Sequence, residues 1–541
     1  MAQTKFNNGR NFAIHRVVKI GVTGPREISN RTQVENSVKI ILKKIENCLV
    51  VSPHSFLAVS ALAEGSDRLL TRTILDYPVN NKILPSSLHA ILEKEEELSL
   101  KKPEADEDLK ELINLATRKT TYDELIKTGQ YHKKAGYIAL AGQLVVDQCD
   151  ILMVVGVKDQ LLPGETKKIA DYASEIGRTI FWINPANGEY EVEEGEDNAI
   201  TGIKYHEKYN KEGMKCSKIL KSQKEDYGYI EDKMNDMDAG DDKKQLIREN
   251  VFIQLVRADQ LAMKFHNRHL LYMYVVFILS PLAVTIVTAY VLFFPNLPIL
   301  LLIEAFMIGF IIMVLFLNRY RQWHRKWVDY RYLAERLRAA LVLSMVGLEC
   351  STSKSLPHQS FHNDWTNKAY EWIYLEQLEM LSLDVPLEDI KQFIQKHWIE
   401  DQIGFYIKKS NFHKTREQIY TVLIYAAFIL TFVGALWHGF ESIFHETLGN
   451  PLYGDIATFI VIVAPAFAAS LTGMRTQQEY SRNHIRYSQM VLYLRKKSIE
   501  IERARTVEEL KEIVEKINKR TLREHQDWKA LFAIHKPEPS A

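Results

Sequence analysis

The sequence predicts an N-terminal α/β domain of the Rossmann-like class, followed by an all-α membrane domain with four transmembrane helices and cytoplasmic helical extensions. Between residues 17 and 184, short runs that are apolar on both faces alternate with helical stretches, which is typical of a doubly wound, mostly parallel sheet. Four longer apolar runs follow, and each is long enough to cross about 30 Å of hydrocarbon as a helix.

The composition excludes two classes of protein. The chain has 541 residues with 69 Lys and Arg against 68 Asp and Glu, a net charge of +1. A general nucleic-acid coat would need a basic excess, and a disordered solvating tail would need an acidic one. The chain is therefore expected to fold.

The predicted α/β domain covers residues 1–185. Its helices are expected near 32–45, 67–77 and 167–177, because these segments suit amphipathic helices between the strands. The strands are predicted at 17–22, 56–60, 83–84, 151–157 and 179–183.

Three loops at the expected carboxyl ends of these strands carry residues that suit an anionic ligand. The first contains Gly21, Thr23, Gly24 and Arg26, which offer free backbone N–H groups, a hydroxyl and a planar guanidinium. In such sheets ligands bind beyond the carboxyl ends of the strands, so the three loops are expected on one edge. The other two loops contribute Gly65, Ser66 and Asp67, and Gly164 and Thr166.

Each loop also has a purely structural interpretation. Gly-Ser-Asp turns occur in many α/β domains as loop geometry, and Asp67 is a candidate for a simple helix N-cap. The conjunction of three loops on one edge is more specific than any one of them.

The motifs GVTGPR (21–26), SALAEGSDRL (60–69), LP (84–85), VDQCDIL (146–152) and GET (164–166) together resemble the SLOG domain, a Rossmann-like family. The resemblance implies binding of a nucleotide or nucleotide-derived signal, and in some relatives hydrolysis of an N-glycosidic bond. Hydrolytic relatives carry a PGGxGTxxE loop, whereas this chain has PGETKKI (163–169). The departure favours sensing over catalysis, and leaves Glu64 and Glu165 as the acid/base pair of an alternative membrane-anchored hydrolase.

The chain is expected to bind no metal and no cofactor. Cys48, Cys149, Cys216 and Cys350 are scattered without a CxxC or Cys/His cluster. Reduced thiols are expected.

The membrane part is predicted to begin after an acidic linker at 186–244. We expect a pre-membrane helix, the first two spans and a continuous cytoplasmic helix in 245–350, a cytoplasmic helical segment in 351–418, and the last two spans with C-terminal helices in 419–541. The spans are predicted at 270–294, 297–317, 419–440 and 456–474.

The positive-inside rule predicts a multi-pass protein with both termini in the cytoplasm. The outer ends of the second hairpin carry no Lys or Arg, while basic residues flank the inner ends of all four spans. Within the spans Glu304 is the clear ionisable residue, and it is a candidate for lining a pore or for an interfacial position. A pore would require a homo-oligomer, because a single four-helix chain with so few polar residues leaves no channel.

The segments YRYLAERLR (330–338) and WIEDQIGFY (398–406) carry a resemblance to SLATT-type transmembrane modules, which accompany SLOG domains and nucleotide cyclases. The resemblance implies a pore-forming or membrane-damaging effector of bacterial antiphage defence in the inner membrane. It implies a nucleotide or oligonucleotide second messenger as ligand and a functional pairing with a nucleotidyltransferase. A transporter is a weaker alternative, because paired charges and interrupted helices are missing from the apolar runs.

Overall fold

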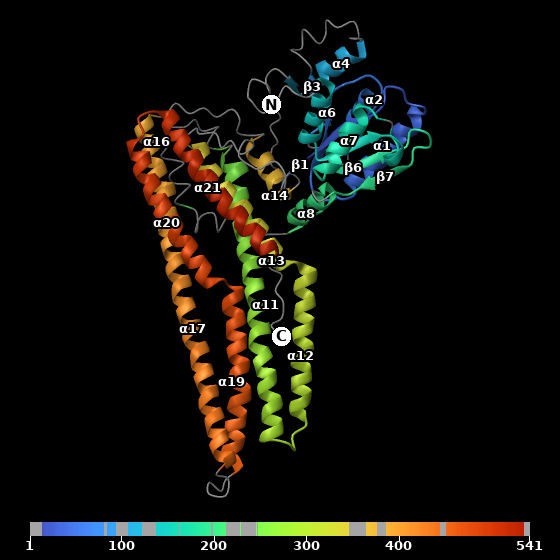
Figure 1. Ribbon diagram of the computed structural model, residues 1–541. Helices are drawn as coiled ribbons and strands as arrows, with labels where there is room; N and C mark the ends of the chain where they lie inside the picture. The colour runs from blue at the N-terminus through green and yellow to red at the C-terminus, as the bar shows by residue number, and fades with distance from the viewer. Residues whose placement is uncertain are drawn as a thin grey trace. The chain divides into compact units, whose positions relative to one another are not determined.

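The structure is a computed structural model, and the chain folds into two units (Figure 1). The first unit takes in Met1–Lys221, Glu249–Gln254 and Thr352–Met380, and the second takes in the rest. The residues described are 13–79, 84–92, 107–121, 137–161, 163–195, 198–212, 228, 245, 247–345, 364–375, 386–443 and 451–534.

The first unit is built around a seven-stranded sheet with the order β4-β3-β2-β1-β5-β6-β7. All neighbouring strands pair in parallel except β6 and β7, which are antiparallel. The predicted parallel-dominated α/β sheet is therefore confirmed. The strands are β1 (Arg16–Thr23), β2 (His54–Ser60), β3 (Ser87–Leu92), β4 (Arg118–Thr121), β5 (Ile151–Val155), β6 (Thr179–Ile183) and β7 (Tyr190–Glu193).

Helices cover both faces of this sheet. One core joins alternate strand residues to α1, α2, α4 and α8, and the other joins the intervening residues to α6 and α7. The helices are α1 (Arg31–Glu46), α2 (Ser66–Leu75), α4 (Glu107–Leu115), α6 (Tyr137–Gln148), η1 (Lys158–Gln160), α7 (Glu165–Glu175) and α8 (Ala199–Lys211), with α14 (Trp365–Tyr370) and η3 (Glu371–Leu375) from later in the chain.

The third strand lies a few residues after the predicted one. We expected it at 83–84, but the strand begins at Ser87, beyond Pro85, whose missing N–H cannot donate to a sheet. Residue 83 lies outside the described residues.

The segment that we predicted as the start of an acidic linker is partly folded. Tyr190–Glu193 forms the edge strand β7, in which Tyr190 and Val192 pack against the core. Glu193 accepts hydrogen bonds from Trp182 and Ser174, so its charge serves the fold rather than solvation. Helix α8 follows, capped by Asn198, and buries Ala199 and Ile203 in the same core. Most of 213–244 lies outside the described residues.

The second unit contains four helices that are long and apolar enough to cross a membrane. This confirms the predicted apolar runs as helices. They are α11 (Ile253–Leu292), α12 (Ile299–Arg321), α17 (Glu400–Ile443) and α19 (Pro451–Gln477), and the remaining helices of this unit are α13 (Trp323–Met345), α16 (Leu387–Ile394), η4 (Gln395–Ile399), α20 (Tyr480–Arg503) and α21 (Val507–Ile534). The π-helical turn η2 (Arg248–Phe252), which leads into α11, belongs almost entirely to the first unit.

The two hairpins of the second unit share one order of elements. In each, a π-helical turn precedes a long helix, the chain reverses into a second span, and a break of one or two residues, one of them left-handed, separates that span from a further helix. The left-handed residues are Gln322, with φ of 53°, and Glu479, with φ of 47°. We expected one continuous helix after the second span, but α12 ends at Arg321 and α13 restarts at Trp323 because Gln322 leaves the helical conformation.

Specific contacts join the hairpins. The Ser470 hydroxyl of α19 donates to the Phe277 carbonyl of α11, and the Gln478 amide donates to the Met273 sulfur at 3.4 Å. Outside the apolar part, Asp259 of α11 accepts from Arg331 of α13 at 2.9 Å. Helix α11 is therefore bonded to α19 within the apolar part and to α13 outside it.

Replacing Gln322 or Glu479 with glycine is expected to raise the free energy of unfolding by about 1 kcal/mol each, since a Cβ is disfavoured in the left-handed region. Thermal unfolding in detergent would measure this. Arg495→Gly, at an exposed position within α20, is the matched control and should lower stability by about 1 kcal/mol. A loss of stability in all three variants would contradict the role assigned to the left-handed residues.

Candidate functional site

The loop after β1 lies at the point where the strand order reverses. The chain moves from β1 outward to β4 on one side and then returns to place β5 on the other side of β1. Thr23 and Val154 are partners at the carboxyl ends of β1 and β5. Crevices at such switch points are the usual binding sites of open α/β sheets. Of the predicted residues here, Thr23 is buried, Gly24 is partly exposed and Arg26 is exposed.

Gly21 lies inside β1 rather than in the loop. A Cβ at this position would stand 2.8 Å from the Cys149 sulfur, so the glycine serves the packing of the strand against the end of α6. The structure thus gives Gly21 a packing role and leaves the loop to start at Gly24.

The second predicted loop is held directly against the first. The Ser66 amide and hydroxyl both donate to the Pro25 carbonyl, at 3.2 and 2.6 Å. A Cβ at Gly24 would stand 2.6 Å from the Ser66 side chain, and a Cβ at Gly65, where φ is +92°, would stand 2.1 Å from the Arg26 carbonyl. The two glycines therefore permit a contact between loops that no other residue type fits.

Asp67 is not the N-cap of α2. Gly65 occupies that position, and Ser66 and Asp67 are the first two residues of the helix. Burial raises the pKa of Asp67 to about 7, against a backbone hydrogen bond with Ala63 and the charge of Arg68, which lower it. A carboxyl group with this pKa exists in both protonation states near neutrality, and when protonated it donates a hydrogen bond.

The third loop follows β5. Gly164 is the N-cap of α7 and no side chain caps this end of the helix. Gly164 and Glu165 are exposed and Thr166 is partly exposed, while residue 162 lies outside the described residues. An uncapped helix N-terminus attracts anions through its free N–H groups, although Glu165 in the first turn opposes this.

The predicted residues therefore divide into two sets. Gly65 and Ser66 pack against the first loop and Asp67 is buried at the start of α2, whereas Arg26, Gly164 and Thr166 remain accessible for a ligand. Glu64 and Glu165, the acid/base pair of the hydrolase alternative, are both exposed, which is the setting of ordinary surface carboxylates. A general acid in a hydrolase is more often enclosed in a pocket.

Glu304 lies on the less exposed face of α12. It shares that face with Leu300, Met307, Ile311 and Asn318, while the opposite face presents bulky apolar side chains such as Phe306. A carboxylate on this face avoids the most exposed side of the helix, where contact with hydrocarbon would be costly.

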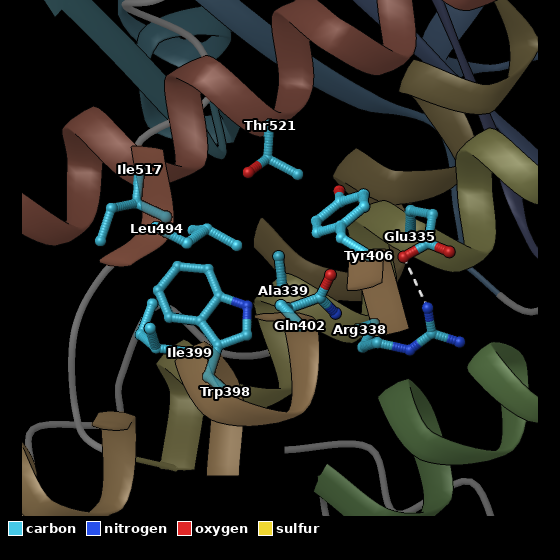
Figure 2. Close-up of a pocket in the computed structure, with 10 residues that line it drawn as sticks. All are labelled: Glu335, Arg338, Ala339, Trp398, Ile399, Gln402, Tyr406, Leu494, Ile517 and Thr521. Atoms are coloured by element: carbon cyan, nitrogen blue, oxygen red, sulfur yellow. Dashed lines mark hydrogen bonds and ion pairs between the residues drawn. The ribbon is translucent and has the colours of Figure 1, made fainter. Parts of the chain in front are cut away.

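A hollow lies among the helices of the second unit, where α13, η4, α17, α20 and α21 meet (Figure 2). Trp398 and Tyr406 form its apolar wall. Its charged groups, Glu335 and Arg338, bind each other at 2.5 Å, and Arg338 also lies 3.7 Å from Asp259. Since these charges are satisfied by each other, the hollow is a packing gap at a helix junction.

Among the described residues, no group of three His, Cys, Asp or Glu side chains is placed to hold a metal ion. Cys48 and Cys149 are free thiols, and burial raises the pKa of Cys149 to about 12. Cys216 and Cys350 lie outside the described residues.

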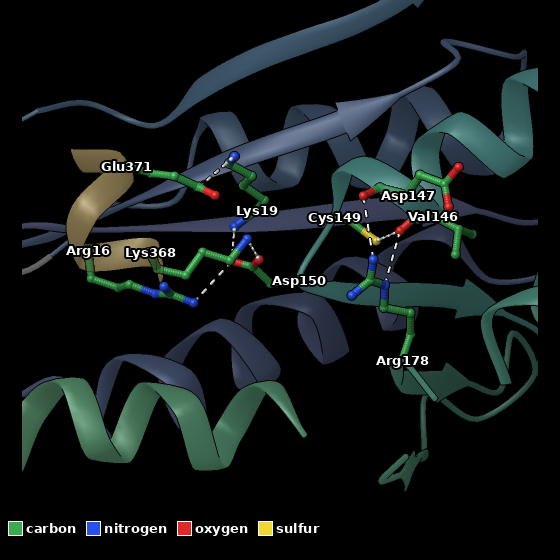
Figure 3. A network of polar contacts seen from close by, with 9 residues as sticks. All are labelled: Arg16, Lys19, Val146, Asp147, Cys149, Asp150, Arg178, Lys368 and Glu371. Atoms are coloured by element: carbon green, nitrogen blue, oxygen red, sulfur yellow. Dashed lines mark hydrogen bonds and ion pairs between the residues drawn. The ribbon is translucent and has the colours of Figure 1, made fainter. Parts of the chain in front are cut away.

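Sequence reasoning missed one polar cluster of the first unit. Asp150, directly before β5, is buried between Arg16 and Lys368 (Figure 3). Asp150 was visible only as part of the VDQCDIL motif, and nothing in the pattern around Lys368 indicated that it joins the α/β unit.

No family model, curated protein or solved structure matched this chain. The resemblance to SLOG and SLATT modules therefore stays a prediction from the sequence motifs.

Replacing Asp67 with Asn should stabilise the protein above about pH 4. The folded-state pKa of Asp67, about 7, exceeds the usual aspartate value of 3.8. The stability that protonation of Asp67 provides is therefore fully present below pH 3.8 and is lost as pH rises towards 7. We expect the wild type to lose stability relative to Asp67→Asn between about pH 4 and 7, and the difference to level off above 7. Chemical unfolding of both proteins at several pH values would measure it, and a constant difference would show that Asp67 is not perturbed.

Proposed function

We propose that this protein is a membrane effector gated by a nucleotide-derived signal. The signal would bind at the crevice beyond β1 and β5, and binding would change the packing of the four-span unit, which forms a pore or disrupts the membrane as an oligomer. The observation that carries this proposal is the position of the Gly24–Arg26 loop at the switch point of an open parallel sheet, in a chain that also has four apolar helices.

The chemistry of the accessible residues favours an anionic ligand. Arg26 has no ion pair among the described residues, so its guanidinium is available for a bidentate contact with phosphate. The uncapped N-terminus of α7 follows the neighbouring strand and adds backbone donors. A nucleotide or oligonucleotide second messenger provides the required phosphates.

The cellular setting follows from the resemblance and from charge asymmetry. We infer a multi-pass protein of a bacterial inner membrane with both termini in the cytoplasm, acting in antiphage defence with a nucleotidyltransferase as the source of the signal. A signal that prefers one state of the membrane unit by about 4 kcal/mol would shift the ratio of states about a thousandfold.

Ion flux from liposomes that contain the full chain would test the proposal. The probes are cyclic and linear oligoadenylates and ADP-ribose. We expect one of them to change the flux, and Arg26→Ala to raise the concentration required by about 10- to 100-fold, which corresponds to one lost charge-assisted hydrogen-bond pair.

Lys39→Ala, which removes an exposed cation from α1, is the matched control and should respond as the wild type does. Equal flux responses of Arg26→Ala and the wild type would show that the ligand does not bind at the proposed site. Consumption of a probe without any flux would favour the membrane-anchored hydrolase.

The pore itself can be tested at Glu304. If its carboxylate lines the conducting path, Glu304→Gln should reduce the preference for cations over anions several-fold, because acidic rings select cations. The reversal potential in planar bilayers under a salt gradient measures this preference. Glu441→Gln, outside the predicted third span, is the control, and an unchanged reversal potential for Glu304→Gln would exclude Glu304 from the path.

A further inference from the structure

A short helical segment from the middle of the chain is embedded in the α/β unit. Residues 364–375 lie between the second and third apolar helices in sequence, yet they belong to the first unit. Asp364 caps α14 by accepting from the Thr366 amide at 2.9 Å. All six residues of α14 are buried, including the charged Lys368.

A buried ion cluster fixes this segment, which we call the clamp (Figure 3). The Lys368 ammonium lies 2.7 Å from one Asp150 oxygen, and the Arg16 guanidinium lies 3.2 Å from the other. The Lys19 amide also donates to Asp150 at 3.2 Å. Because the Asp150 side chain has no exposed surface, its charge depends on these partners.

Aromatic contacts and a second ion pair extend the attachment. Trp372 stacks on His15 with ring centroids 4.3 Å apart, and Trp365 lies 5.0 Å from the ring of Tyr209. Lys19 and Glu371 form an ion pair at 3.6 Å. Burial would raise the pKa of Glu371, but the nearby Lys368 and Lys19 hold it below its usual value. The clamp therefore combines charge pairing with apolar burial.

The clamp and the candidate ligand site use opposite ends of the same two strands. Arg16 opens β1 and Asp150 precedes β5, whereas Thr23 and Val155 end these strands at the switch point. The two strands are neighbours, with Ile20 paired to Ile151. A paired strand of eight residues spans roughly 25 Å, so a shift at one edge is carried to the other through hydrogen-bonded backbone.

We propose that the clamp transmits ligand binding from the α/β unit to the membrane helices. The inference rests on the proposed function, because it assigns the route by which the signal acts. The clamp has a seated state, in which Lys368 is paired with Asp150, and a released state, and a ligand that changes the relative position of β1 and β5 shifts the balance between them. Since the clamp lies in the only stretch of chain between the second and third spans, its release alters the restraint on both hairpins.

Lys368→Met would test the clamp, since it removes the ammonium and keeps most of the side-chain volume, while Asp150 retains Arg16. The full chain in liposomes is compared with the wild type by amide hydrogen exchange and by ion flux. We expect exchange in 365–375 to rise at least tenfold while the interiors of β1 and β5 stay protected. We also expect basal flux to change at least threefold, and the response to oligoadenylates and ADP-ribose to shrink by at least tenfold.

Lys391→Met is the matched control, because Lys391 is a similarly buried lysine paired with Glu388 at 3.0 Å within the second unit. It should leave exchange in 365–375 and both flux values as in the wild type. If Lys368→Met does not fold, Lys19→Gln, which breaks only the pair with Glu371, should give smaller changes in the same direction.

The outcomes separate the clamp from the proposed function. If no probe changes flux in the wild type, the proposed gating by these nucleotides fails, and the basal flux of Lys368→Met against Lys391→Met still decides the clamp. Faster exchange in 365–375 with unchanged flux would overturn transmission. Unchanged exchange would overturn the attachment itself.

Discussion

The buried charge of Asp150 is the constraint on which the organisation of the α/β unit depends. A carboxylate without solvent contact costs several kcal/mol unless cations and hydrogen-bond donors compensate for it. Arg16 supplies one cation from the adjacent strand, but the second, Lys368, comes from a distant part of the chain. The buried cluster therefore joins two distant chain segments of the α/β unit, and removal of either partner is expected to cost about 3–5 kcal/mol.

Close packing also fixes the loops at the carboxyl edge of the sheet. Two glycines, Gly24 and Gly65, bring the loops after β1 and β2 into contact, and the Pro25 carbonyl takes both donors of Ser66. The buried Ser66 thus holds a loop in which Pro25, Arg26 and Glu27 are exposed. Because the backbone of this loop is fixed by its contacts, less conformational entropy is lost when Arg26 binds an anion.

Much of this fold could be predicted from the sequence, for reasons that particular elements make clear. The strands β1, β2, β5 and β6 are apolar on both faces, so their apolar runs identify them in the sequence. The four apolar helices are identified in the same way. The edge strands β4 and β7 were missed because exposed strands need few apolar residues. The sequences RKTT and YEVE resemble loops until their partners are known.

In the candidate site, the loops could be predicted from glycine and cap-type residues. Which residues of these loops are accessible could not be predicted, because accessibility depends on contacts between the loops, such as that of Ser66 with Pro25. The clamp was beyond prediction, because a lysine in a helical segment carries no local sign of a partner more than two hundred residues away.

The distant origin of Lys368 has a consequence for biosynthesis. Asp150 is translated well before Lys368, and α11 and α12 are translated in between. At roughly 5–20 residues per second, this interval lasts on the order of ten seconds or more. During it the carboxylate lacks Lys368, one of the two cations with which it forms ion pairs in the folded unit. The α/β unit therefore reaches its final form only after the first hairpin has been made, and membrane insertion of that hairpin precedes completion of the domain that begins the chain.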